Sequence, residues 1–172
     1  MTSQANTPAQ LHTISVLVRN QPGVLVRVAL VFARRGFNIE SLVVSADQVE
    51  PTYSRMTITC SGDIETLEQI IKQVAKLVDV VRAIDHTGQA VVETEIALLK
   101  IKAPLTKRTE ILQVADHYQA KVVDCHAESL ILRVTGASEK LDSIVSLLKP
   151  FGVVELVRSG KILMTRGPES PT

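Results

Sequence analysis

The sequence predicts an α+β protein built from two ferredoxin-like βαββαβ domains, at residues 11–87 and 88–166. Two observations support this. Alternating apolar segments and segments with amphipathic helical spacing follow one another in the order strand, helix, strand, strand, helix, strand. The same order recurs after Gly88. Because crossover connections are right-handed, both helices of each domain should cover one face of an antiparallel sheet.

The first domain contains six such segments. In chain order they are the strand HTISVLVR (12–19), the helix VLVRVALVFARR (24–35), the strands FNIESLVVSA (37–46) and YSRMTITC (53–60), the helix IETLEQIIKQVAKL (64–77) and the strand VDVVRAIDH (78–86). Gly36 should end the first helix. Asp63 is the expected N-cap of the second, and Glu68 and Lys72 are spaced for an ion pair on it.

The second domain repeats this plan without obvious residue identity. Its segments are the strand ETEIALLKIKA (93–103), the helix LTKRTEILQVADHYQA (105–120), the strands KVVDCHAE (121–128) and SLILRVTG (129–136), the helix SEKLDSIVSLLKPF (138–151) and the strand VVELVRSG (153–160), followed by KILMT (161–165). Ser138 is the expected cap of the second helix.

One sheet face in each domain is expected to lack helices. On the first strand, Ile14, Val16 and Val18 alternate with polar residues, which indicates a single buried face. Leu17, with Leu42 and Val44 on the next strand, is expected on the opposite face. Open edges and apolar outer faces need cover, and a domain of about 80 residues buries a limited core. We therefore expect an oligomer, most simply a homodimer.

Composition and charge exclude several classes of function. Lys and Arg (19) nearly balance Asp and Glu (18) in the 172 residues, which argues against binding to nucleic acid or to anionic lipid. The polar start MTSQANTPAQ lacks the apolar region of a secretory signal. The most apolar window contains Arg27 and is shorter than the ~20 residues of a membrane span. A cytoplasmic protein with flexible tails at 1–10 and 167–172 is expected.

The two cysteines show no metal or disulfide spacing. Cys60 and Cys125 lie far apart in sequence, as buried free thiols of a reducing compartment do. Cys125 and His126 are neighbours on a strand and therefore point to opposite faces. Asp124 and His126 share a face, but two ligands are too few for a structural zinc site. No metal site is expected.

The turn NQPG between the first strand and the first helix is the candidate binding site. Backbone N–H groups that open a helix lack intrahelical partners and attract a carboxylate. Gly23 would allow close approach of a ligand, and the side chains of Asn20 and Asn38 each offer a donor and an acceptor. Together they would hold the ammonium and carboxylate groups of an amino acid.

The apolar lining of such a site would come from Val24, Leu25 and Ile39. None of these side chains titrates, so no catalytic residue is expected. A structural interpretation remains open from these residues alone. Asn, Pro and Gly dominate turns of every kind, so NQPG could simply connect a strand to a helix.

The residues around this turn also carry a family resemblance. HTISVLVRNQPGVLVRVALVFARRGFNIESL (12–42) resembles the N-terminal ACT domain of the small, regulatory subunits of acetolactate synthase (acetohydroxyacid synthase). SRMTITCSGD (54–63), LEQIIKQVAKLVDVVRA (67–83) and VELVRSGKILMTRG (154–167) are similar to further parts of that family. The resemblance extends from Leu11 to Gly167. RRGFNIESL, SRMTI and VRSG make it specific for the small subunit rather than for ACT domains in general.

The resemblance implies a regulatory protein without a catalytic site or cofactor of its own. Its partner would be the large catalytic subunit, which carries thiamine diphosphate, Mg²⁺ and FAD. The small subunit would activate that partner and make it sensitive to feedback by a branched-chain amino acid, usually valine, in branched-chain amino-acid biosynthesis. In the family the effector lies between two ACT domains of a dimer. The matching positions here are Asn20, Gly23, Val24 and Leu25 on one chain, and Asn38 and Ile39 on the other.

The sequence also bears on three other functions. An ACT-type amino-acid sensor of another system would use the same turn. Small phosphatases of the acylphosphatase kind use an Arg at the first helix and an Asn on the next strand, as Arg27 and Asn38 would allow, but Arg27 lies within the apolar helix pattern. RNA-binding domains of this fold stack bases on aromatic strand residues, and this chain has only three Phe and two Tyr.

Overall fold

The computed structural model describes residues 10–167, in two compact units. The first unit runs to Val91 and the second spans Val92–Met164, while Thr165 and the residues after it group with the first. The predicted tails at 1–10 and 167–172 lie outside the described residues except for their inner ends. None of the helices in the described part of the chain is both long and apolar enough to cross a membrane.

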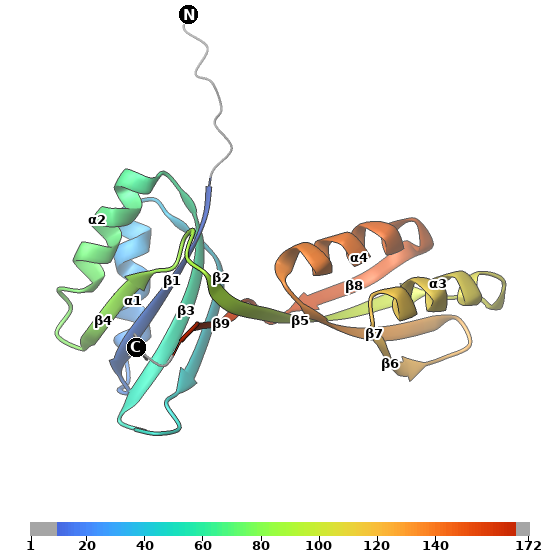
Figure 1. Cartoon of the computed structure of the whole chain (residues 1–172), viewed down its shortest axis with the longest axis horizontal. Helices are drawn as coiled ribbons and strands as arrows, with labels where there is room; N and C mark the ends of the chain where they lie inside the picture. Colours follow the sequence, from blue (N-terminus) through green and yellow to red (C-terminus); the bar gives the residue numbers. More distant parts are fainter. Residues whose placement is uncertain (1–9, 168–172) are drawn as a thin grey trace, which may run out of the picture. The chain divides into compact units, whose positions relative to one another are not determined.

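The first unit has the predicted βαββαβ order. Its elements are β1 (Gln10–Arg19), α1 (Val24–Arg34), β2 (Asn38–Ala46), β3 (Tyr53–Gly62), α2 (Ile64–Val74) and β4 (Val80–Asp85). The strands pair antiparallel in the order β2-β3-β1-β4, and α1 and α2 lie on one face of this sheet (Figure 1). Val28 and Phe32 of α1 and Leu67 and Ile70 of α2 pack on the strands to form an aliphatic core.

The second unit repeats the order and adds a final strand. Its elements are β5 (Val91–Lys102), α3 (Leu105–His117), β6 (Lys121–Cys125), β7 (Ser129–Gly136), α4 (Ser138–Gly152), β8 (Val153–Arg158) and β9 (Ile162–Thr165). The strand order is β6-β7-β5-β8, and β9 also pairs with β5 (Figure 1). Ile111 of α3 and Leu141 and Ile144 of α4 are buried in a separate core. The prediction of two ferredoxin-like domains is confirmed.

In the first unit, α1 ends and α2 begins at the residues predicted for these roles. Gly36 follows α1 with a φ of 70°, in the left-handed region that glycine adopts readily. Asp63 caps α2, because its carboxylate accepts a hydrogen bond of 2.7 Å from the N–H of Thr66. The ion pair between Glu68 and Lys72 is present at 3.5 Å.

A β-bulge in β2 makes one expectation wrong. The register against β3 shifts between Ile39 and Ser41, so one extra residue is inserted there. Leu42 and Val44 consequently pair with the core residues Ile58 and Met56 and lie on the helix-covered face. Leu17 pairs with Arg55 and lies on the opposite face, as expected.

The outer face of the first sheet is polar and largely buried. Thr13 and Ser15 of β1 alternate with the core residues, yet both are buried, so β1 has two buried faces rather than the predicted one. Part of the cover comes from His86, which follows β4. The Ser15 hydroxyl shares a hydrogen bond of 2.7 Å with Nε2 of His86, and Nδ1 of His86 lies 3.3 Å from Oε1 of Gln89.

Two further expectations for the second unit are wrong. Ser138 is the first residue of α4 rather than its cap, and its hydroxyl donates to the carboxylate of Glu95. Cys125 is exposed, because β6 is an edge strand. Only Cys60 is a buried thiol, and burial raises its pKa to about 11.

Candidate effector site

The NQPG turn opens α1 without a side-chain cap. Gly23 occupies the N-cap position with a φ of 82°, and no side-chain cap hydrogen bond is present among the described residues. The N–H of Val24 bonds only weakly, at 3.4 Å to the carbonyl of Gln21, while that of Arg27 bonds to Gly23 at 3.1 Å. Since the N–H groups in the first turn of a helix have no intrahelical acceptors, this end of α1 offers donors to an anion.

Asn20 ties the turn to the loop before β3. Its backbone N–H donates to the carbonyl of Thr52 at 2.7 Å, and its Nδ2 donates to the carbonyl of Pro51 at 3.2 Å. Asn20 is exposed, so a ligand could reach its side-chain amide. Leu25 is 41% exposed and offers an apolar contact, whereas Val24 is only 2% exposed and packs in the core.

Asn38 and Ile39 lie at the opposite end of the same sheet. Asn38 pairs with Ser61 near the end of β3, whereas Arg19, which precedes Asn20, pairs with Tyr53 at its start. The eight residue steps from Tyr53 to Ser61 span about 25–30 Å at roughly 3.3 Å each. The structure therefore does not bring Asn20 and Asn38 together within one chain.

Glu40 is a neighbour of Asn38 that the sequence pattern did not reveal. Its carboxylate accepts hydrogen bonds from Nδ2 of Asn38 at 3.0 Å and from the hydroxyl of Ser61 at 2.9 Å. These bonds, that of Asn38 first, lower the pKa of Glu40. Glu40 thereby orients the Asn38 amide and adds an exposed negative charge beside it. Its position depends on the β2 bulge, which has no signature in the sequence.

Arg27 brings a positive charge to the NQPG turn. Its guanidinium binds Asp79 at 2.5 Å, and a Cβ atom placed on Gly23 would lie 3.3 Å from its Nη1. The side chain is 46% exposed, so it remains open to a second anion. Because Asn38 lies at the other end of the sheet, Arg27 and Asn38 do not form the phosphatase-like pair within one chain.

The described residues contain little that resembles a catalytic centre. Ser15 and His86 have the hydrogen bond of a nucleophile and its base, but they are only 2% and 4% exposed, so a substrate could not reach them. Across residues 10–167, no group of three or more His, Cys, Asp or Glu side chains is arranged to hold a metal ion. Nε2 of His126 lies 3.5 Å from Oδ2 of Asp124, and no third residue among those described is arranged with them to hold a metal ion.

Comparisons with known proteins agree on one family. Residues 14–82 match the family described as AHAS small subunit-like ACT domain, and residues 94–167 match the small subunit of acetolactate synthase. The chain is 44% identical to the acetolactate synthase small subunit of Mycolicibacterium smegmatis over 157 residues, which cover 91% of this chain and 92% of that protein.

Archaeal and structural relatives give the same result. A probable acetolactate synthase small subunit of Archaeoglobus fulgidus is 44% identical over 156 residues, covering 91% of this chain and 97% of that one. The crystal structure of the acetolactate synthase small subunit from Thermotoga maritima superposes with a TM-score of 0.81 at 38% identity, covering 93% of this chain and 99% of that one. The chain belongs to the family of acetolactate synthase small subunits, with an ACT domain as its first unit.

Proposed function

We propose that this chain activates the thiamine-diphosphate-dependent catalytic subunit of acetolactate synthase and makes it sensitive to feedback inhibition by valine. Thiamine diphosphate, Mg²⁺ and FAD would belong to the catalytic partner, and this chain would contribute binding alone. The observation that carries the proposal is the placement of Asn20 and Asn38 at opposite ends of one sheet. A ligand that contacts both must lie between two chains.

A homodimer through β2 would assemble that site. β2 is an edge strand of the first sheet, so its outer side is open to a second β2. In an antiparallel pair of β2 strands centred on Leu42, Asn38 of one chain would lie beside Ala46 of the other. Ala46 pairs with Ser54, at the end of the sheet where Asn20 lies. In such a dimer, two-fold symmetry would bring Asn38 toward the NQPG turn of the second chain, twice per dimer.

The groups gathered in this way suit a free amino acid. The uncapped N–H groups of α1 and the guanidinium of Arg27 would attract the carboxylate. The carboxylate of Glu40 and the amide oxygen of Asn38 would hold the ammonium group. Leu25 supplies an exposed aliphatic contact for a branched side chain. The site binds both charged ends of the ligand and has no group placed to cleave it.

Regulation follows if valine binds one dimer arrangement better than another. A ligand can shift an equilibrium only by its difference in affinity for the two states. A coupling free energy of about 1–3 kcal/mol, equivalent to about 5–150-fold in affinity, would be enough for feedback. The bound amino acid would change how the two ACT domains pair, and thereby how they contact the catalytic subunit.

The direct test is an acetolactate assay of the matching large subunit with and without this chain, each with and without valine. We expect higher activity with the chain present, and loss of that gain when valine is added. Titration calorimetry of the wild type against Asn38→Ala locates the site. Equal valine affinity for both proteins would contradict the site, and valine binding without any effect on the large subunit would instead favour a sensor for another system.

A further inference from the structure

Strand β8 leaves an apolar edge of the second sheet open. β5 lies on one side of it, and no strand within residues 10–167 pairs with its other side. Val154, Leu156 and Val157 are 57%, 39% and 53% exposed. Proteins usually protect such edges with charged side chains, proline or a covering element, and in β8 (VVELVR) only Glu155 and Arg158 are charged. The exposed aliphatic residues make this edge a candidate surface for a partner.

One flank of α4 borders this edge with four residues on a single helix face. Asp142, Val145, Ser146 and Lys149 are spaced i, i+3, i+4 and i+7. Together with Val153, Leu156 and Arg158 of β8 they line a pocket of about 450 Å³. We call these four α4 residues the α4 stripe. In chain order the stripe presents an acid, an aliphatic side chain, a hydroxyl and a base.

The α4 stripe is complementary to itself under two-fold symmetry. When a second α4 lies antiparallel beside the first, with the axis midway between Val145 and Ser146, Asp142 of each chain lies opposite Lys149 of the other. The same operation makes the two β8 strands antiparallel along their open edges, the orientation in which they can share a hydrogen-bond ladder. We propose that the α4–β8 edge is an isologous interface that binds a second copy of this chain.

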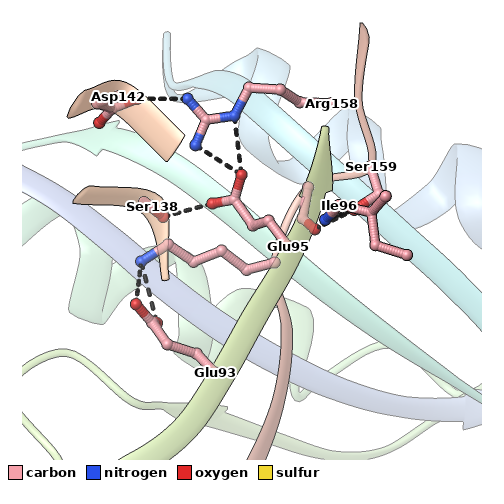
Figure 2. A network of polar contacts seen from close by, with 9 residues as sticks. Glu93, Glu95, Ile96, Ser138, Asp142, Arg158 and Ser159 are labelled. Carbon is pink, nitrogen blue, oxygen red and sulfur yellow. Dashed lines mark hydrogen bonds and ion pairs between the residues drawn. The ribbon is translucent and has the colours of Figure 1, made fainter. Parts of the chain in front are cut away.

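A polar network holds the α4 stripe in place before any partner binds. The carboxyl of Glu95, only 6% exposed, accepts hydrogen bonds from Ser138 at the start of α4 and from Arg158 at the end of β8 (Figure 2). Arg158 also donates to Asp142 at 2.5 Å. The buried carboxylate of Glu95 thus links β5, where it lies, to α4 and β8. Because these side chains are already held in place, little side-chain entropy would be lost when a partner binds.

The charges of the stripe remain available to a second chain. Although it binds Arg158, the Asp142 side chain is 64% exposed and can accept another cation. Lys149 is exposed on the same helix face, one turn before the end of α4. Opposite charges that meet at both ends of an interface fix its register and disfavour other pairings. This contact lies wholly in the second unit and is separate from the β2 contact proposed for valine binding.

Cross-linking at the predicted two-fold axis tests the interface in the full-length chain. Packed helices have axes 8–10 Å apart, so Ser146→Cys residues from two copies should react with a short bismaleimide. The background carries Cys125→Ser to remove the exposed thiol, while Cys60 stays unreactive because burial raises its pKa to about 11. Ser143→Cys is the matched control, since Ser143 is also exposed on α4 but lies outside the α4 stripe.

We expect efficient linkage at position 146 and little at 143. Lys149→Glu places two acids opposite each other, so linkage should fall by about tenfold or more. Val154→Lys places a lysine on the edge without altering the network, and should also weaken linkage. Circular dichroism verifies that each variant is folded.

Three results would overturn the proposal. These are equal linkage at positions 146 and 143, linkage at 146 that Lys149→Glu leaves unchanged, and a cross-link from position 146 to the acetolactate synthase large subunit in place of a second copy of this chain. The last result would assign the edge to a different partner.

Discussion

If two chains form the effector site together, mixing two chains that carry different substitutions in the site should restore some of the valine binding. Within one chain, the end of β1 before Asn20 and the start of β2 at Asn38 are separated by eight residue steps along β3, or about 25–30 Å. The backbone of a single amino acid spans only about 4 Å. A ligand that needs both asparagines must therefore take them from different copies.

The experiment uses two variants, Asn20→Ala and Asn38→Ala. Each removes a hydrogen bond to a charged group of the ligand, which is worth about 1.5–3 kcal/mol, so each alone should bind valine about 10- to 150-fold more weakly. In a mixed dimer, one site combines the intact Asn20 of one chain with the intact Asn38 of the other. The second site of that dimer carries both substitutions.

The assay is titration calorimetry after unfolding and refolding the two variants together in equal amounts. Random pairing makes about half of the dimers mixed, so about a quarter of all sites should regain wild-type affinity. Each variant refolded alone is the control and should regain none. A mixture that regains no tight sites, although mass spectrometry detects the mixed dimer, would refute the two-chain site.

Three further outcomes test the fold. Gly23→Ala should cost about 1–2 kcal/mol in the free energy of unfolding, because residue 23 has a φ of 82°, and an unchanged urea midpoint would contradict this. Leu141→Ala should lower the free energy of unfolding by about 2–5 kcal/mol, because Leu141 is 0% exposed. Leu147→Ala on the same helix should lower it much less, because Leu147 is 50% exposed. Similar losses for the two variants would contradict this. Burial lowers the pKa of His86 below its ordinary 6.5. Near that pH the unfolded chain therefore binds more protons at His86 than the folded chain does. The free energy of unfolding should fall as the pH drops from about 7.5 to about 5.5. Urea midpoints of the wild type and His86→Gln measure this loss, which should be shallower in the variant.

Sequence patterns predicted those features that depend on neighbouring residues. Asp63 caps α2, and Gly36 ends α1, because both act on backbone groups within a few residues of themselves. The repeated order of strands and helices was predictable for the same reason. Each apolar face has its own period, and the crossover rule then fixes the side on which the helices lie.

Features that depend on distant residues were not predictable in this way. Ser138 has the residue type of a cap, but the buried carboxylate of Glu95, more than forty residues earlier, accepts its hydroxyl hydrogen instead. A single inserted residue in β2 turned Leu42 and Val44 toward the core. An alternating pattern cannot reveal such an insertion, because both faces of β2 carry aliphatic residues.

Sequence patterns predicted part of the local geometry at the candidate site. The NQPG turn has the uncapped helix start that its sequence indicates, and Leu25 is exposed as a lining residue should be. Val24 faces the core and can offer a ligand only its backbone. The β2 bulge positions Glu40 beside Asn38, and Asp79 on the loop before β4 holds the guanidinium of Arg27 near the turn. Local spacing predicts neither contact.

The two thiols differ in exposure, so the rates at which they react with a dye can report on the opening of the first unit. Cys125 is open to solvent and would take a maleimide dye at once, marking the second unit without any mutation. Cys60 is 0% exposed, so a second equivalent of dye can react only when the first sheet opens. The slow phase of labelling would then time the opening of the ACT domain, and a bound amino acid that braces this domain would lengthen it.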